Sequence, residues 1–280
     1  VKPGDPVVLS WAPYCGNCFY CNRGEFRLCE KAVSTSRFRK DGKIIHNYSH
    51  VSSFAEYTVI PEAGAIPIRS DVPLDKAALV GCAVPTGWGA VVNTARVEPG
   101  ASVAVIGLGG VGLSAVMGAV TVSAEKIIGV DINGAKLEMV QDFGVTHTIN
   151  SSSEDMVERL KELTDGRGPD YAFDTIGLPE VTSKAYAAVR PGGTVVTVGM
   201  NSDWAEVTLS FPLIYGERKL LGCCYGSIQP PVDIPRIIDL YMAGKLDLDK
   251  LITKRFPIEK INDAFDTMLK GEVARSLIEF

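Results

Sequence analysis

The chain has 280 residues, 46% apolar and 22% charged, which excludes a disordered, collagen-like or disulfide-rich small protein. Its net charge of −5 is spread without long blocks of one sign, so neither nucleic acid nor an anionic membrane is an expected partner. The longest apolar runs, such as residues 103–108, fall short of the roughly 20 residues that a membrane span needs. No leader with a cleavage site is visible, and we expect a cytoplasmic protein of about two domains.

The first 83 residues predict an irregular, all-β region. Short apolar stretches at 6–9 and 53–60 lie between loops rich in Gly, Pro and Cys. Within this region four cysteines follow the spacing C-x2-C-x2-C-x7-C, at Cys15, Cys18, Cys21 and Cys29. Thiolates this close together suit a tetrahedral Zn²⁺, and a site filled by four sulfurs leaves no position for substrate. The spacing therefore predicts a structural zinc lobe at 15–29.

Three other interpretations of these cysteines compete with zinc. Bacterial iron–sulfur loops use a shorter last gap followed by Pro, whereas Glu30 follows Cys29 here. Disulfides are disfavoured without an export signal. A redox C-x-x-C pair is disfavoured because the motif is doubled and no βαβ unit surrounds it.

Residues 84 to about 225 alternate strand-like runs with helical patterns. The predicted strands are 103–107, 126–131, 146–150, 171–177, 194–200 and 219–225. A helix is expected over 154–163, with Ser151 and Glu154 spaced as a capping box. Strict alternation implies a parallel sheet with helices on both faces, and six strands are the complement of the doubly wound dinucleotide-binding (Rossmann) fold. Beyond this zone, two further helical patterns cover 234–243 and 258–270.

A glycine-rich turn follows the first of these strands and opens a helix. Its residues are Gly107, Leu108, Gly109, Gly110, Val111 and Gly112. Strand before, helix after and Asp131 at the end of the next strand are the context that this motif needs to bind a dinucleotide. The Asp131 carboxylate would accept both adenosine ribose hydroxyls and repel a 2′-phosphate, which predicts NAD rather than NADP. The alternative is a glycine turn that binds no nucleotide.

The remaining cysteines and histidines are ambiguous on their own. Cys82 lies at the junction of the β region and the nucleotide domain and is a candidate ligand or nucleophile. Cys223 and Cys224 lie in a predicted strand, where cysteine is usually an inert small apolar residue. His46, His50 and His147 more commonly represent solvated or core histidines than metal ligands.

Together these residues resemble the alcohol dehydrogenases of the zinc-containing medium-chain dehydrogenase/reductase superfamily, and the resemblance covers essentially the whole chain. It runs through the residue groups 1–5, the cysteine lobe, 35–38, 53–57, 81–82, 86–87, the glycine turn and 130–131. The resemblance implies a GroES-like catalytic domain over 1–83, an NAD-binding Rossmann domain over 84–224 and a C-terminal return to the catalytic domain over 225–280. It also implies a homodimer or homotetramer.

The resemblance assigns roles to further residues. Cys82 matches a ligand of a second, catalytic zinc. The residues matched to the adenosine side of NAD are Ile132 and Lys136, those matched to the nicotinamide side are Thr175, Ile176, Val198, Gly199 and Met200, and Arg275 matches a pyrophosphate-binding arginine. Tyr48, Met200 and Cys224 fall where the family lines its alcohol pocket. The implied reaction is hydride transfer between an alcohol and NAD, giving an aldehyde or ketone.

The front of the chain departs from the family pattern. The family carries a cysteine and a Gly-His-Glu segment, upstream of the stretch matched by residues 1–5, that supply the other catalytic-zinc ligands. The chain opens with Val1 and contains no match for them, so we expect an N-terminally truncated fragment that is inactive alone. Two alternatives remain: a dehydrogenase of S-(hydroxymethyl)glutathione, disfavoured because neutral Val33 stands where that subfamily has an arginine, and a non-catalytic scaffold that binds NAD and zinc.

Overall fold

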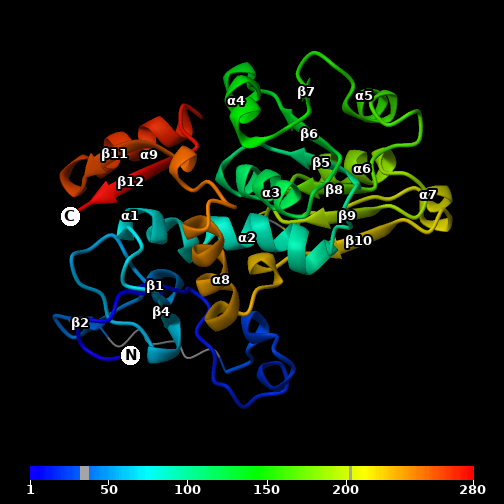
Figure 1. Cartoon of the computed structure of the whole chain (residues 1–280). Helices are drawn as coiled ribbons and strands as arrows, with labels where there is room; N and C mark the ends of the chain where they lie inside the picture. The colour runs from blue at the N-terminus through cyan, green and yellow to red at the C-terminus, as the bar shows by residue number, and fades with distance from the viewer. Residues whose placement is uncertain (32–37, 202–203) are drawn as a thin grey trace. The chain divides into compact units, whose positions relative to one another are not determined.

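The structure, a computed structural model, describes residues 1–31, 38–201 and 204–280, which form two compact units (Figure 1). Unit 1 consists of Val1–Pro85 and Ile228–Phe280, whereas unit 2 is the continuous segment Thr86–Ser227. Unit 1 is therefore assembled from both ends of the sequence. Val33 lies outside the described residues, as do residues 35–37 of the group 35–38 that contributes to the family resemblance.

Unit 2 is built on a six-stranded parallel sheet. Its strands are β5 (Ser102–Ile106), β6 (Lys126–Asp131), β7 (His147–Asn150), β8 (Tyr171–Asp174), β9 (Thr194–Thr197) and β10 (Lys219–Gly222) (Figure 1). They lie in the order β10-β9-β8-β5-β6-β7, and every neighbouring pair is parallel. The direction of winding reverses between β5 and β8, as in the dinucleotide-binding fold. The predicted six-stranded doubly wound sheet is confirmed.

Helices cover this sheet and bury its central strands. They are α3 (Gly110–Thr121), α4 (Gly134–Met139), α5 (Met156–Glu162), α6 (Pro179–Ala188) and α7 (Phe211–Tyr215), with α2 (Ala83–Gly89) leading into a π-helical turn at Ala90–Ala95. From Val103 to Ile106 all four residues of β5 are buried, so both faces of this strand are covered. One core cluster joins Ala104 and Ile106 to Leu160 of α5 and to Tyr186 of α6.

Three strands end earlier than the apolar runs predict. β8, β9 and β10 stop at Asp174, Thr197 and Gly222, not at 177, 200 and 225. Beyond β8 the Asp174 side chain accepts the backbone N–H groups of Ile176 and Gly177, which turns the chain out of the sheet. Gly177 itself has a φ of +84°, a left-handed conformation that favours glycine.

The predicted capping box of α5 is wrong. Asp155, not Ser151, is the N-cap, and its carboxylate accepts the N–H groups of Val157 and Glu158. Glu154 instead accepts the backbone N–H of Asn150, the last residue of β7, at 3.0 Å. The helix therefore begins at Met156.

The described residues of unit 1 form three two-stranded sheets. β1 (Val7–Leu9) and β4 (Ala65–Pro67) are antiparallel, as are β2 (Phe38–Lys40) and β3 (Lys43–Ile45), while β11 (Ile252–Pro257) and β12 (Arg275–Glu279) are parallel. Its α-helices are α1 (Leu74–Ala77), α8 (Pro230–Met242) and α9 (Ile261–Leu269), which confirms the two helical patterns predicted near the C-terminus. Val8, Ile66, Val80 and Ile234 are buried in its core.

The strand-like interpretation of residues 53–60 is wrong, because this segment contains no strand. Hydrogen bonds from side chains, rather than backbone pairing between strands, fix the position of this segment. The Asn47 amide donates to the carbonyl of Val59 at 3.1 Å, and the Thr58 hydroxyl donates to the carbonyl of Val51. Side-chain bonds of this kind compete with regular backbone pairing.

Candidate functional site

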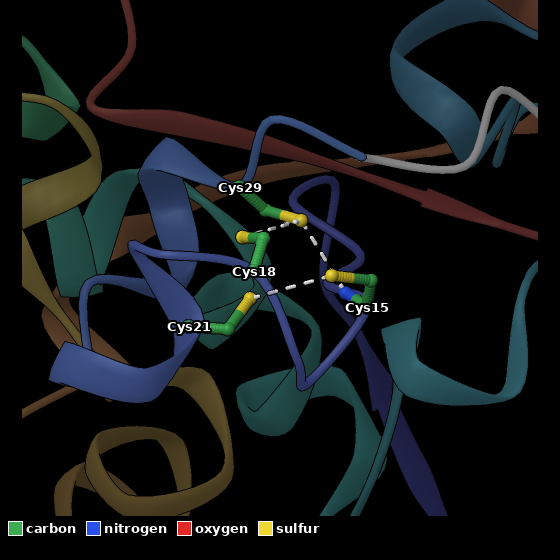
Figure 2. Close-up of side chains that lie close together, drawn as sticks. All are labelled: Cys15, Cys18, Cys21 and Cys29. Atoms are coloured by element: carbon green, nitrogen blue, oxygen red, sulfur yellow. Dashed lines mark hydrogen bonds between the residues drawn. The ribbon is translucent and has the colours of Figure 1, made fainter.

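The four cysteines of the 15–29 lobe face a common centre (Figure 2). All four Sγ atoms lie within 4.8 Å of one another, and those of the pairs Cys15–Cys21 and Cys18–Cys29 are each 3.9 Å apart. A tetrahedron of Zn–S bonds of about 2.3 Å requires sulfurs about 3.8 Å apart. The geometry of this cluster therefore fits a four-sulfur zinc site.

Local turns bring these sulfurs together. Cys21 begins a 3-10 turn (Cys21–Arg23) that ends at Gly24, whose φ of +75° lets its N–H return to the Cys21 carbonyl. A second turn (Phe26–Leu28) ends at Cys29, and the backbone N–H of Cys15 donates to the Cys29 sulfur at 3.3 Å. The lobe is thus closed by a hydrogen bond between its first and last cysteines.

The thiols of the lobe differ in their proton affinity. The backbone N–H of Cys21 bonds to the Cys18 sulfur and lowers the pKa of Cys18 to about 6, against the effect of burial. Burial raises the pKa of Cys21 to about 12. Four thiolates at this spacing repel one another, so full deprotonation requires a cation at their centre. The cluster is therefore suited to a metal and poorly suited to four free thiolates.

The glycine turn of unit 2 has the form of a phosphate cradle. A Cβ at Gly112 would lie 1.8 Å from the carbonyl oxygen of Gly107, so the start of α3 packs directly on the end of β5. Gly107 has a φ of +90°. A Cβ at Gly109 would have no atom within 4 Å, which leaves open space directly before the N-terminus of a twelve-residue helix. This is where backbone N–H groups and the helix dipole favour a phosphate.

Asp131 joins this cradle to the neighbouring strand. It is the last residue of β6, is 7% exposed, and accepts the N–H of Leu108 at 2.7 Å and that of Asn133 at 3.0 Å. The ammonium group of Lys136 lies 3.9 Å from its Oδ2 atom. Ile132, the next residue, is exposed. The structure therefore brings together the glycine turn, Asp131 and Lys136.

The residues after β8 and β9 also lie at this edge of the sheet. The Thr175 hydroxyl donates to the Gly107 carbonyl at 2.7 Å, which links the end of β8 to the glycine turn. A Cβ at Gly199 would lie 2.3 Å from the backbone nitrogen of Gly177, so the two strand ends are in backbone contact. Ile176 and Met200 are exposed beside this contact, and Val198 is half-buried.

Sequence reasoning missed Asp174, the last residue of β8. Its side chain is fully buried and accepts the N–H groups of Ile176 and Gly177 and the hydroxyl of Thr182. A signal was present, because an acidic residue ends an otherwise apolar run at the carboxyl end of a parallel strand.

Cys82 and Arg275 both belong to unit 1. Cys82 is exposed and follows the 3-10 turn Ala78–Gly81, and Arg275 begins β12 and is half-buried. Burial lowers the pKa of the Arg275 guanidinium, and the charge of the Cys82 thiolate acts in the opposite direction. Among the described residues, Arg275 forms no ion pair with a carboxylate, and Cys82 belongs to no group of three metal-ligating side chains. Those residues therefore do not fit a complete second zinc site.

The three residues expected in the alcohol pocket come from different parts of the fold. Tyr48 lies in a short turn of unit 1 and is 83% exposed. Met200 follows β9, and Cys224, also exposed, follows β10, both in unit 2.

Among the described residues, no single helix has the length and apolarity to cross a membrane, although the bent pair Leu74–Gly81 and Ala83–Ala95 together reach both.

Comparison with known proteins identifies the family of this chain. Residues 110–243 match the zinc-binding dehydrogenase family, and residues 1–70 match the alcohol dehydrogenase GroES-like domain. The chain is 39% identical over 295 residues to an alcohol dehydrogenase class-3 of Dictyostelium discoideum, a match that covers 99% of this chain and 77% of the relative.

Two solved structures superpose over the whole chain with TM-scores of 0.93 and 32% identity, and 78% of each is covered. They are an alcohol dehydrogenase zinc-binding domain protein from Burkholderia ambifaria and the benzyl alcohol dehydrogenase of Acinetobacter calcoaceticus. These matches confirm the GroES-like and Rossmann components of the predicted fold. The chain belongs to the zinc-containing alcohol dehydrogenases of the medium-chain dehydrogenase/reductase superfamily, oxidoreductases that use zinc and NAD.

Proposed function

We propose that unit 2 binds NAD across the carboxyl ends of its strands for the oxidoreduction of a small alcohol. The observation that carries this proposal is the cradle at Gly109, open in front of α3 and bordered by the buried carboxylate of Asp131. When bound, NAD supplies the hydride acceptor for a CH–OH group. The backbone of the glycine turn binds the pyrophosphate, and Thr175, Ile176, Val198, Gly199 and Met200 border the nicotinamide.

Asp131 and Lys136 select the cofactor in this proposal. The Asp131 oxygens already accept two backbone N–H groups, which fixes the carboxylate at the end of β6. Each oxygen retains a lone pair for a ribose hydroxyl. A 2′-phosphate at the same position would meet a fixed negative charge, so NADP is rejected. Ile132 borders the adenosine ribose beside them.

The cysteine lobe has a structural role in this proposal. Cys15, Cys18, Cys21 and Cys29 would hold Zn²⁺ with all four positions filled by sulfur, which leaves no position for a substrate. The fit of the sulfur spacing supports this assignment. Zinc at this position stabilises unit 1 rather than taking part in the reaction.

Cys82 and Arg275 complete the proposed residue roles. Arg275 would bind the pyrophosphate, which is supported by its half-buried guanidinium without a carboxylate partner among the described residues. Cys82 would be one ligand of a catalytic zinc. Because the described residues do not complete that zinc site, no step of the reaction is derived through it. Tyr48, Met200 and Cys224 would border the alcohol.

The test is a titration of the purified 280-residue chain with NADH and NADPH, together with its zinc content. We expect NADH to bind with at least about tenfold preference and zinc to copurify. An assay of NAD reduction with benzyl alcohol and short primary alcohols accompanies the titration. Failure to bind NADH would overturn the proposal.

A second candidate is activity of the class-3 type, which the name of the Dictyostelium discoideum relative favours. Val33, the neutral residue that argues against it, lies outside the described residues. Titrating the NADH-loaded chain with S-(hydroxymethyl)glutathione and with benzyl alcohol separates the two candidates by binding, because no turnover is expected from the 280-residue chain. Selective binding of the glutathione adduct would favour the class-3 type.

We infer a domain organisation of 1–83, 84–224 and 225–280, with the first and last parts forming the catalytic domain. Its support is the division into units at Pro85 and Ile228. We also propose that the enzyme works in the cytoplasm, where disulfides are rare; the structure joins none of its seven cysteines in a disulfide.

We further propose a homodimer or homotetramer. β10 is an edge strand that pairs with β9, and Leu220 on it is exposed. Phe211 and Tyr215 of α7 and Trp204 add exposed apolar surface in the same unit. An unpaired strand edge with apolar neighbours is a template for association. Light scattering after size exclusion should give a molar mass of two or four times 30.0 kDa. Leu220→Lys should lower that molar mass.

A further inference from the structure

Asp174 holds three segments of unit 2 together from a fully buried position at the end of β8. Its Oδ1 atom accepts the N–H of Ile176 at 2.9 Å and of Gly177 at 3.0 Å. Its Oδ2 atom accepts the hydroxyl of Thr182, in α6, at 2.6 Å. Each carboxylate oxygen therefore has a separate structural partner.

The backbone of the same residue fixes the neighbouring strand end. The Asp174 carbonyl accepts the N–H of Val198 at 2.8 Å and that of Gly199 at 2.9 Å. Both residues follow β9. One residue thus controls the direction in which the chain leaves β8 and the direction in which it leaves β9.

These two strand ends are packed too closely to move independently. A Cβ at Gly177 would lie 2.6 Å from the carbonyl carbon of Gly199. Ile176 and Met200, on either side of this contact, are 42% and 91% exposed. Asp174 therefore supports, from within the unit, a surface that faces outward at the carboxyl edge of the sheet.

The position of this surface gives it a role. In a doubly wound sheet a dinucleotide lies across the point where the strand order reverses, with one half on each side. Here the reversal lies between β5 and β8. The glycine turn and Asp131 occupy the β5–β6 side, where the adenosine half would bind. The β8–β9 side is left for the other half, the nicotinamide riboside.

We propose that Asp174 is a positioning residue that sets the strand ends after β8 and β9 as the platform for the nicotinamide ring. The inference rests on the proposed NAD-binding function. Asp174 touches neither the cofactor nor the substrate in this proposal, and it acts through the backbone of residues 175–177 and 198–199. Replacing it should loosen the nicotinamide half of the site and leave the adenosine half intact.

The comparison of NADH with ADP-ribose tests this separation, because ADP-ribose lacks the nicotinamide ring. Dissociation constants of both ligands are measured on the 280-residue chain by NADH fluorescence and by calorimetry. Asp174→Ala should weaken NADH about tenfold relative to ADP-ribose, since it removes three hydrogen bonds to a charged acceptor. Asp174→Asn keeps an acceptor of the same shape but loses the charge, and should weaken NADH about threefold.

Asp170 provides a matched control, because it directly precedes β8 whereas Asp174 ends it. Its carboxylate also accepts three hydrogen bonds, from the Ser102 backbone N–H at 2.8 Å and from the Ser102 hydroxyl and Arg190 side chain at 2.6 Å each. Asp170→Asn should reduce thermal stability without changing the ratio of NADH to ADP-ribose affinity. A general loss of packing would affect both variants alike.

The outcomes separate the two proposals. A selective loss of NADH affinity in the Asp174 variants, absent in Asp170→Asn, supports the inference. An unchanged affinity ratio in Asp174→Asn, or an equal fall of both affinities, overturns it while leaving the NAD site in place. If the unmodified chain binds neither ligand, both proposals fail. Should Asp174→Ala not fold, the ratio in Asp174→Asn decides.

Discussion

Gly112 packs on Gly107 so closely that a Cβ on Gly112 would lie 1.8 Å from the Gly107 carbonyl oxygen. The obstacle is backbone, which cannot rotate away as a flexible side chain would. Three residues earlier, Gly109 has open space where its Cβ would stand. Glycine at position 112 is therefore required by the packing of α3 on the end of β5. Glycine at position 109 is instead required by the phosphate that we propose to lie in the open space beside it.

Gly112→Ala and Gly109→Ala should consequently fail in different ways. Gly112→Ala should destabilise unit 2 by about 1–3 kcal/mol or more, because α3 must move off β5. Gly109→Ala should keep its stability, since its φ of −81° suits alanine, but lose NADH affinity. Thermal unfolding and NADH titration of both variants check this, and unaltered NADH affinity in Gly109→Ala would argue against a phosphate at the turn.

Asp131→Ser should weaken NAD binding and relieve the rejection of NADP. The lost hydrogen bonds to a charged acceptor correspond to about 1.5–3 kcal/mol, or roughly 10- to 150-fold in affinity. Titrations with both cofactors on the variant and the unmodified chain measure the change. Equal affinity for NAD and NADP before substitution would contradict the role of Asp131.

Cys18→Ser should abolish zinc binding in the lobe and destabilise unit 1, because metal binding there is coupled to folding. Zinc content by metal analysis should fall from about one to near zero per chain, while unit 2 still binds NADH. Cys224→Ser is the matched control, since this exposed cysteine lies outside the lobe, and its zinc content should not change. Iron with visible absorbance in place of zinc would refute the assignment.

Cys82→Ala should leave the zinc content of the 280-residue chain at about one, since a catalytic zinc needs three protein ligands. Alcohol oxidation by the unmodified chain should be undetectable for the same reason. Metal analysis and NAD reduction on the same preparations test both expectations. Two zinc ions per chain, or a loss of zinc in Cys82→Ala, would show that Cys82 has ligand partners.

The sequence predicts the cysteine lobe and the glycine turn well because both are local. Cys15 and Cys29 are close in sequence, and the turn lies between a strand and a helix that its own pattern predicts. The strand end at Asp174 was missed although the acidic residue itself marks it, because the predicted strand extends through Ile176 and Gly177, whose N–H groups bond to the Asp174 side chain instead. The expected alcohol-pocket residues were available only through the resemblance, since no periodicity or spacing connects residues so far apart.

One non-local requirement is visible only in the structure. Gly87 forms with Thr86 the residue pair 86–87 that contributes to the resemblance. It has no room for a side chain, because its Cβ would lie 2.1 Å from the Val111 carbonyl oxygen. The pair marks a close approach between α2 and the start of α3. Such a packing constraint leaves no periodic signal in the sequence.

Because unit 1 is assembled from two segments on either side of unit 2, the two units fold in a set order during translation. Unit 2 is continuous and can fold on the ribosome once residue 227 has emerged. Residues 1–85 complete their core later, because Ile66 and Val80 lie in elements that contact α8, which contains Ile234 and is translated after unit 2. During that interval the nascent N-terminal part exposes apolar surface, which makes it the part of the newborn chain that most needs a chaperone.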